Sequence, residues 1–392
     1  MNAFDKYYDV IVIGAGPAGS SAAAVLARGG ARVLLCDKEN FPREKICGDC
    51  INPGCWRIFD ELGVSEEIAA HAESIHGISI VGRSGKLINF SYDEERRNRT
   101  LNQLSKPKFV AIKRSALDQI LLNQAIVDGA SFSPATSIES VHQEKGPDNM
   151  WRIGLRTSDP DGLINIGCKV LIGADGRNSK VASLIRESKK STIKRVEHSG
   201  KRIGIQFSVR RPSQLGPNVM MFFFENGYGG IVGVSPEAAN IAMVIKRQEG
   251  LKAVEGRSEF IRRTIHSNGF MRETFSELRL IDKIRTAFPV DPRINHVSAP
   301  NIYLVGDACH TTEPFTGEGV FFAIADGVSR AAAIAKSFGL ESKASIRLNP
   351  NPRLRDLTFS PLLRNIALAE TLLRFGSNHR TIANLVVKSV LG

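Results

Sequence analysis

The sequence predicts an α/β protein in which a largely parallel sheet is interrupted by an inserted antiparallel sheet. Three observations support this prediction. An apolar strand at 10–13 runs into a glycine-rich turn and an alanine-rich helical segment. Two further apolar strands, at 170–172 and 302–305, also end in glycine turns. Between them, residues 202–247 alternate in polarity as half-buried antiparallel strands do.

The first turn has the spacing of a dinucleotide-binding motif. Gly14 allows a tight turn after the strand, Gly16 lets the backbone approach a pyrophosphate, and Gly19 lets helix and strand pack closely. A second strand at 32–36 ends at Asp37, 18 residues past Gly19, where a carboxylate can accept hydrogen bonds from a ribose diol. This combination predicts a dinucleotide bound at the start of the helix.

The middle of the chain continues the same domain. Residues 109–112 begin a second βαβ-like passage, with a helix expected over 114–128. An antiparallel ribbon is expected from three strand-like segments, 137–142, 151–155 and 163–166. The strand at 170–172 then leads into a glycine turn at 173–176.

Residues 202–247 are predicted to form one antiparallel sheet. Alternation along a strand should place Phe222 and Phe224 on one face of the sheet and Phe223 on the other. These phenylalanines either line an apolar cavity or pack in the core. Helices are expected over 254–267 and, after the strand at 302–305, from Gly319 to about Phe338; two more should follow at 361–375 and 380–391.

This order predicts a discontinuous domain plan. A nucleotide-binding domain is expected from 1–80, 105–190 and 280–345, and a substrate domain from 81–104 and 191–279. Residues 346–392 form the expected C-terminal helical segment, whose apolar stripes beside basic residues suit packing on the domain, a lid, a partner surface or a membrane-facing edge.

The last glycine turn points to a flavin. Asp307, at a strand end, can accept a hydrogen bond from a ribityl hydroxyl, and Gly317 and Gly319 let the backbone approach a planar ring. The positive end of the following helix would stabilise negative charge on a reduced flavin at its N1–C2=O edge.

These motifs resemble the FAD-dependent superfamily that holds class A flavoprotein monooxygenases and geranylgeranyl reductases. The resemblance covers nearly the whole chain: residues 14–19, 173–179 and 306–319 are similar to its three motifs, and Arg114 with Asp118 to its R-x-x-x-D helix. It implies a Rossmann-like, glutathione-reductase-type FAD-binding domain with an inserted antiparallel β-sheet substrate domain. Motifs and resemblance together predict these cofactor-binding residues: Gly14, Gly16, Pro17, Ala18, Gly19, Asp37, Lys38, Arg43, Cys47, Gly48, Arg114, Asp175, Gly306, Asp307, Pro314, Gly317, Glu318 and Gly319.

Two catalytic candidates point to different branches of the superfamily. Residues 42–49 (PREKICGD) and 316–319 (TGEG) resemble geranylgeranyl reductases, which makes Cys47 a candidate for a substrate-side role; a small residue packed in a tight turn is the alternative. His310 follows Gly-Asp-Ala-Cys as in many hydroxylases, and is either a general base or an orienting residue.

The expected function is therefore FAD-dependent redox chemistry on a hydrophobic, unsaturated substrate, prenyl or polyketide-like. NAD(P)H or another reductant would supply hydride through the flavin, and NAD(P)H should bind transiently because the chain has no second complete G-x-G-x-x-G unit. The alternative is a monooxygenase that hydroxylates or epoxidises through a flavin C4a-hydroperoxide. A non-catalytic FAD-binding protein is a more remote alternative.

Composition narrows the possible partners. The formal net charge of +12 has three possible explanations: basic residues that are simply solvated at the surface, an anionic or carrier-bound substrate, or peripheral contact with a membrane. Nucleic acid is not expected, because the basic residues are scattered without a binding motif. The uncharged stretch 10–27 is interrupted by glycines and lacks a basic leader, so a cytoplasmic protein is expected. No metal is expected at Cys47, Cys50 and Cys55, since no fourth ligand follows at suitable spacing.

Overall fold

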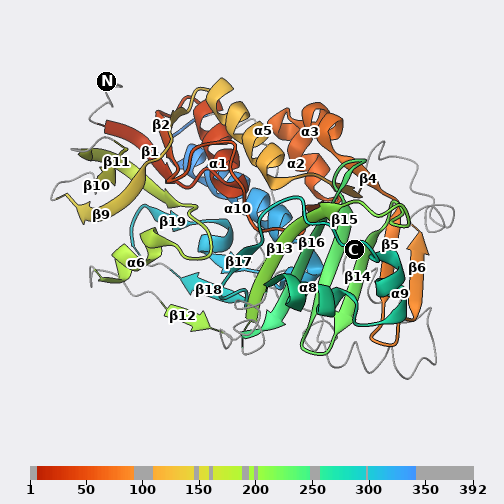
Figure 1. Ribbon diagram of the computed structural model, residues 1–392. Helices are drawn as coiled ribbons and strands as arrows, with labels where there is room; N and C mark the ends of the chain where they lie inside the picture. Colours follow the sequence, from red (N-terminus) through yellow and green to blue (C-terminus); the bar gives the residue numbers. More distant parts are fainter. Residues whose placement is uncertain are drawn as a thin grey trace.

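The computed structural model describes residues 7–91, 109–144, 150–158, 162–187, 194–197, 202–247, 257–296 and 299–340, and the two expected C-terminal helices lie outside them. Two large sheets dominate the molecule and lie at opposite ends of the view in Figure 1. The first contains the expected nucleotide-binding unit, and the second contains the strands of residues 202–247.

The first sheet is built around β1 (Tyr7–Ile13). This strand pairs in parallel with β2 (Val33–Cys36) on one side and with β11 (Leu163–Gly173) on the other. Further parallel pairing adds β8 (Ser131–Ser133) beside β2 and β19 (Ile302–Leu304) beside β11. The expected buried parallel strands at 10–13, 32–36, 170–172 and 302–305 are thus confirmed. The glycine turns follow the carboxyl ends of β1, β11 and β19, and Asp37 follows that of β2.

Strand β11 is longer than the sequence suggested. The two separate strands expected at 163–166 and 170–172 form one strand of 11 residues. Its first half pairs antiparallel with β10 (Trp151–Arg156), which pairs with β9 (Ser137–Gln143), and its second half pairs in parallel with β1. Gly167 lies between the two expected segments and does not interrupt the strand. A Cβ at Gly167 would stand 2.2 Å from the ring of Tyr7 in β1, so this glycine allows the two paired strands to pack closely.

Helices cover one face of the first sheet. The core on that face joins β1 to α1 (Pro17–Arg28), α5 (Arg114–Val127) and α10 (Gly319–Ser337). The opposite face is packed by β9, β10 and α6 (Lys180–Glu187). The helices expected after the first glycine turn, at 114–128 and after Gly319 are confirmed within one or two residues.

One expected strand lies in a different sheet. The segment at 109–112 forms β7 (Phe109–Ala111), which lies antiparallel between β3 (Cys50–Ile51) and β4 (Glu73–Ile75) in a separate small sheet. The βαβ-like interpretation of this passage was therefore wrong for its first strand. A three-residue apolar segment carries no information about its pairing partner, which tertiary contacts decide.

The second large sheet has the strand order β17-β13-β16-β15-β14-β5-β6. Its strands are β17 (Arg285–Ala287), β13 (Arg202–Arg210), β16 (Ala238–Lys246), β15 (Gly227–Gly233), β14 (Val219–Phe224), β5 (Gly77–Val81) and β6 (Leu87–Ser91). The four strands from residues 202–247 pair antiparallel with their neighbours among themselves, as expected.

Two expected domain boundaries do not match this sheet. The boundary between residues 80 and 81 falls inside β5, which pairs in parallel with β14. Strand β17, expected in the nucleotide-binding domain, pairs with β13. Both strands join the second sheet through pairing with residues far along the chain, which their own sequences do not specify.

The two faces of the second sheet differ in character. Phe222 and Phe224 lie on the face packed against α8 (Arg257–Ile265) and α9 (Gly269–Thr274), with their ring centroids 5.9 Å apart. Phe223 lies on the other face with Tyr228, as the alternation predicted. A three-stranded sheet of β12 (Lys194–Glu197), β18 (Arg293–His296) and β20 (His310–Thr311) completes the fold.

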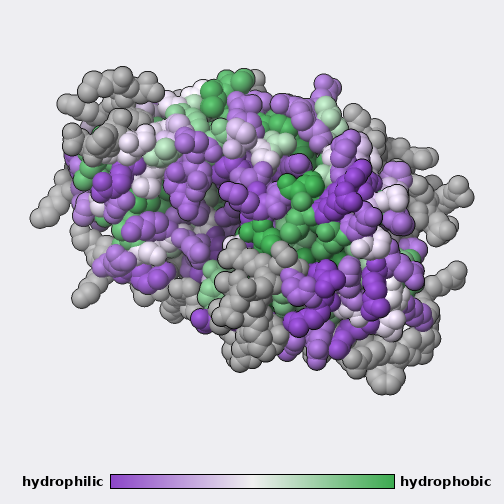
Figure 2. All heavy atoms as spheres, in the orientation of Figure 1, coloured by the Kyte–Doolittle hydropathy of each residue, from purple (hydrophilic) through white to green (hydrophobic). Residues whose placement is uncertain are grey.

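The visible surface is mostly hydrophilic. Figure 2 shows hydrophobic residues gathered near the middle of this face, among polar neighbours. Within the described part of the chain, no helix has both the length and the apolar character needed to cross a membrane.

Candidate functional site

The first glycine turn contains two kinds of glycine. Gly14 adopts a φ of +102°, and a Cβ there would stand 2.4 Å from the carbonyl oxygen of Ala174. A Cβ on Gly19 would stand only 1.8 Å from the carbonyl oxygen of Gly14. These two glycines are therefore needed for the packing of the turn against α1 and the end of β11, as the motif predicted.

Gly16 borders open space instead. Within 4 Å, a Cβ on Gly16 would meet only Nη2 of Arg43, at 3.2 Å. Helix α1 begins at Pro17, and no side chain caps its start. Backbone N–H groups in the first helical turn, including that of Ala18, have no intrahelical acceptor, so this end of α1 suits an anion such as a pyrophosphate.

Asp37 ties this turn to the end of β2. Its Oδ2 accepts a hydrogen bond from the backbone N–H of Ala15 at 2.8 Å, and its Oδ1 accepts one from Glu39 at 3.0 Å. An ionised carboxylate offers about four acceptor positions. Asp37 can therefore shape the turn and still accept a hydrogen bond from a ribose hydroxyl.

Cationic side chains converge beside the turn. Asp118, which is fully buried, pairs with Arg114 through two hydrogen bonds of 2.8 and 2.9 Å and with Nη1 of Arg43 at 3.2 Å. Lys45 reaches towards Gly176, with its Nζ 3.9 Å from the place of a Cβ there. Burial, and next the charge of Arg114, lower the pKa of Lys45, whereas Asp307 acts in the opposite direction. Arg43 and Lys38 also lower the pKa of Lys45, so cations from the loop after β2 and from the start of α5 lie in one neighbourhood.

The third glycine turn faces this neighbourhood. Gly306, at the start of η1 (Gly306–Ala308), has a φ of +58°, and a Cβ there would stand 2.9 Å from the Cβ of Ala18. Asp307 follows it and is half-buried. Close approach between Gly306 and Ala18 places the first and third motifs side by side.

The loop before α10 leaves room for a planar group. Pro314 begins η2 (Pro314–Thr316), and Gly317 has a φ of +67° with nothing within 4 Å of the place of its Cβ. A Cβ on Gly319 would meet only Oγ1 of Thr312, at 3.6 Å, and Glu318 is buried at the start of α10. Gly48 likewise borders open space.

Asp175 has a structural role that the sequence did not suggest. Its Oδ2 accepts hydrogen bonds from the backbone N–H groups of Lys180 at 2.6 Å and Val181 at 3.1 Å, which caps α6. Its Oδ1 is buried without a hydrogen-bond partner. Contact between Asp175 and a cofactor stays a prediction, and Oδ1 is the atom that would make it.

The Cys47 turn is attached to the second sheet by two buried amide side chains. Gln206 of β13 accepts a hydrogen bond from the Cys47 N–H at 3.3 Å, and Asn240 of β16 donates one to the Cys47 carbonyl oxygen at 2.9 Å. Gln206 also donates to Asn240 at 3.0 Å. Sequence reasoning missed both amides, although each is a polar residue in an apolar strand and that pattern was visible.

Two titratable side chains, Cys47 and Asp49, lie in this turn. Burial raises the pKa of the Cys47 thiol, although the neighbouring Arg114, which hydrogen-bonds to it, acts in the opposite direction. Burial also raises the pKa of Asp49 to about 7, again against the influence of Arg114. One oxygen of Asp49, Oδ1, is buried without a hydrogen-bond partner. At neutral pH the thiol therefore carries its proton, and Asp49 titrates.

His310 lies in regular structure. It is a half-buried residue of β20 and stands opposite Ile294 of β18 in an antiparallel pair. The role of His310 as a general base stays a prediction.

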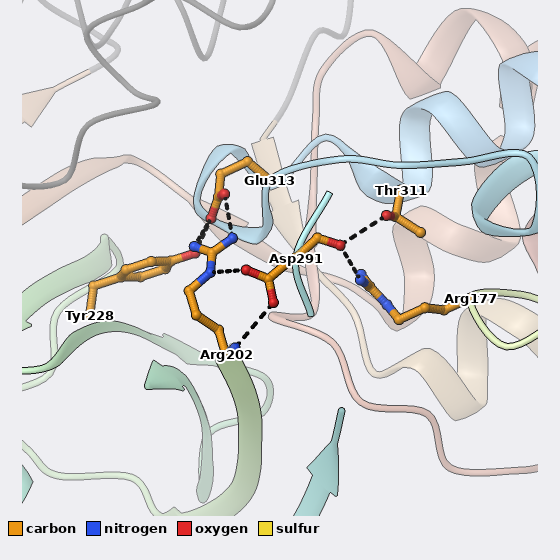
Figure 3. Close-up of polar contacts among 6 residues, drawn as sticks. All are labelled: Arg177, Arg202, Tyr228, Asp291, Thr311 and Glu313. Atoms are coloured by element: carbon orange, nitrogen blue, oxygen red, sulfur yellow. Dashed lines mark hydrogen bonds and ion pairs between the residues drawn. The ribbon is translucent and has the colours of Figure 1, made fainter. Parts of the chain in front are cut away.

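Sequence reasoning also missed an ionic cluster between the second sheet and the third glycine turn, shown in Figure 3. Arg202, the first residue of β13, donates to both oxygens of Glu313, at 2.9 and 2.8 Å. The hydroxyl of Tyr228 donates to Glu313 at 2.6 Å. Burial, and next the charge of Glu313, raise the pKa of Tyr228 well above its usual range, so this phenol stays protonated.

Aromatic rings line the space beside this cluster. The ring of Phe315, in η2, lies 5.9 Å from that of Phe223 and 5.2 Å from that of Tyr228, as centroid distances. Met221 packs in the same apolar cluster. The face of the second sheet that carries Phe223 is therefore in contact with the third glycine turn.

The model of the FAD binding domain family matches residues 7–345. The chain belongs to this family. The residues described above fit FAD. The starts of α1 and α10 border open space at Gly16 and Gly317, and a group of cations beside them suits the pyrophosphate. Oδ1 of Asp49 and Oδ1 of Asp175 are buried without a hydrogen-bond partner. The predicted superfamily, its fold and its FAD cofactor are thereby confirmed.

Named relatives place the chain among redox enzymes. It is 25% identical over 346 residues to the digeranylgeranylglycerophospholipid reductase of Methanocaldococcus jannaschii, covering 87% of this chain and 80% of that one. The solved structure of the flavin-dependent brominase Bmp2 is 18% identical, with a TM-score of 0.75 and coverage of 98% and 94%. Aklavinone-11 hydroxylase, solved with FAD and aklavinone, is 22% identical, with a TM-score of 0.70 and coverage of 86% and 64%. The two structures show the shared fold.

Proposed function

We propose that this FAD-dependent oxidoreductase reduces a carbon–carbon double bond of a hydrophobic, prenyl or polyketide-like substrate. The observation that carries the proposal is the Cys47 turn. Its sequence resembles that of geranylgeranyl reductases, and two side chains of the second sheet hold its backbone. Similarity over most of the chain to a digeranylgeranylglycerophospholipid reductase supports the same reaction class.

FAD, when reduced, supplies a hydride to one carbon of the double bond. A proton must reach the other carbon, and the protonated thiol of Cys47 is our candidate donor. Arg114 hydrogen-bonds to this thiol and would stabilise the thiolate that remains. The double bond would become a single bond, NAD(P)H or another reductant would be the source of the electrons, and Cys47 would regain its proton from solvent.

The aromatic face of the second sheet is the proposed substrate wall. Phe223, Tyr228 and Phe315 present apolar surface beside the third glycine turn and would exclude water from the reacting bond. The net charge of +12 suits an anionic or carrier-bound form of such a substrate, and contact with a membrane surface from the cytoplasm.

Oxygenation is the second candidate function. His310 follows Gly306-Asp307-Ala308-Cys309 as in many hydroxylases, and the fold is shared with aklavinone-11 hydroxylase. If the protein is a monooxygenase, it inserts oxygen into the same class of substrate, and His310 rather than Cys47 is the proton-handling residue.

Anaerobic product analysis tests the proposal. The enzyme is reduced without oxygen and mixed with a geranylgeranyl lipid or an aromatic polyketide, and the products are examined by mass spectrometry. We expect a product that has gained two hydrogen atoms. A product that forms only with oxygen and contains an added oxygen atom would replace reduction with oxygenation. Bound FAD that no reductant reduces would indicate a non-catalytic protein.

A further inference from the structure

The ionic cluster of Figure 3 connects three parts of the molecule that are distant in sequence. Arg202 comes from the second sheet, and Glu313 from the loop that leads into η2. Asp291 lies between β17 and β18. Its backbone carbonyl oxygen accepts hydrogen bonds from Arg177 at 2.9 Å and from Thr311 at 3.2 Å. Arg177 follows the middle glycine turn, so two of the three glycine motifs meet the second sheet here.

Arg202 is the centre of this cluster. Its Nε donates to Asp291 at 2.9 Å and its backbone N–H to the same carboxylate at 3.1 Å, while both terminal nitrogens donate to Glu313. The side chains of Arg202, Asp291 and Glu313 are 19%, 9% and 12% exposed. Because two largely buried carboxylates face one guanidinium, removing Arg202 would take away the positive charge that they share and leave two negative charges repelling each other.

Glu313 attaches the loop before α10 to the second sheet. It directly precedes Pro314, and Phe315 then packs against Phe223 and Tyr228. Gly317 and Gly319, which border open space before α10, follow within six residues. A displacement of Glu313 would therefore move the glycines that approach the cofactor.

From these contacts we infer that Arg202 is a positioning residue. It holds the loop from Glu313 to Gly319 against the second sheet, and so sets the flavin-facing edge of the site without touching the flavin. The inference depends on FAD binding, and is independent of whether the enzyme reduces or oxygenates its substrate.

Arg202→Met tests the inference through the flavin itself. The variant is titrated with FAD, and its visible spectrum and midpoint potential are compared with wild type. We expect FAD to bind at least about tenfold more weakly, with shifts of the absorption band and the potential. Arg202→Lys keeps the positive charge but cannot donate the paired hydrogen bonds. Its FAD affinity and potential should therefore lie between those of wild type and Arg202→Met. Arg211→Met is the matched control: Arg211 lies just past the other end of β13, is 20% exposed, and bonds to Ser235.

A double variant separates positioning from stability. Arg202→Met with Glu313→Gln removes the negative charge that Arg202 had balanced, so its thermal stability should recover relative to Arg202→Met alone. Its FAD affinity, spectrum and potential should stay altered, because the two hydrogen bonds from the Arg202 guanidinium to residue 313 are still missing. Wild-type flavin properties in the double variant would overturn the inference and leave the cluster a purely structural role.

Discussion

The glycine turns and the contacts between the two sheets use polar groups in different ways. At the turns, backbone N–H groups and missing side chains create the site, as at Gly16 and the start of α1. Between the sheets, side chains reach partners that are distant in sequence: Arg202 and Glu313 are 111 residues apart, and Asn240 and Cys47 are 193 apart. The comparison teaches that local spacing encodes the glycine turns, whereas long-range pairs attach those turns and the Cys47 turn to the second sheet.

The largest expected effect distinguishes the two kinds of glycine in the first turn. Gly19→Val should destabilise the protein by about 3 kcal/mol or more, because its side chain would overlap the Gly14 carbonyl group. Gly16→Val should keep the fold and abolish FAD binding, because its side chain fills the space that the pyrophosphate needs. Thermal unfolding of the apoprotein and FAD titration measure the two effects. Equal loss of stability in both variants would contradict the distinction.

Asp307 tests whether the third turn binds the cofactor directly. Asp307→Ala removes a charge-assisted hydrogen bond, so FAD affinity should fall by roughly 1.5–3 kcal/mol, while the fold is kept. Asp37→Ala should weaken FAD by a similar amount and also lower stability, because Asp37 accepts a hydrogen bond from Ala15. Calorimetric titration of both variants is the measurement. Unchanged FAD affinity in both variants would mean that FAD binds elsewhere on the protein.

Asp49 should make stability depend on pH. Burial raises its folded-state pKa to about 7, above the ordinary value of 3.8. Between these values the folded state binds more protons than the unfolded state, so this carboxyl lowers stability as pH rises from about 4 to 7. Asp49→Asn should therefore raise the melting temperature of the apoprotein at pH 8 and change it little near pH 4. An equal gain in melting temperature at both pH values would contradict a raised pKa of Asp49 in the folded state.

The smallest expected effect on binding concerns Cys47. Cys47→Ser should keep FAD, because the hydrogen bonds that attach this turn to the second sheet use the backbone N–H and carbonyl groups of Cys47 and not its thiol. Turnover or product pattern should change, since a serine hydroxyl is a much weaker acid than a thiol. Steady-state assays with product identification provide the measurement, and unchanged turnover with identical products would favour a packing role.

The sequence by itself determined the cofactor and the domain that binds it. The turns after β1, β11 and β19 were recognisable because their glycines act through local backbone geometry, which spacing along the chain records. Strand alternation likewise predicted the opposite faces of Phe222 and Phe223, because side-chain direction in a strand has a period of two.

Only the tertiary structure decided which distant segments meet. The pairing of β5 with β14 and of β7 with β3 and β4 depends on partners that a short apolar segment does not specify. The same holds for Arg202 with Glu313 and for Gln206 with Cys47. A buried polar side chain requires a hydrogen-bond partner. The sequence shows which polar side chains lie in apolar strands, but their partners become known only when the two sheets pack together.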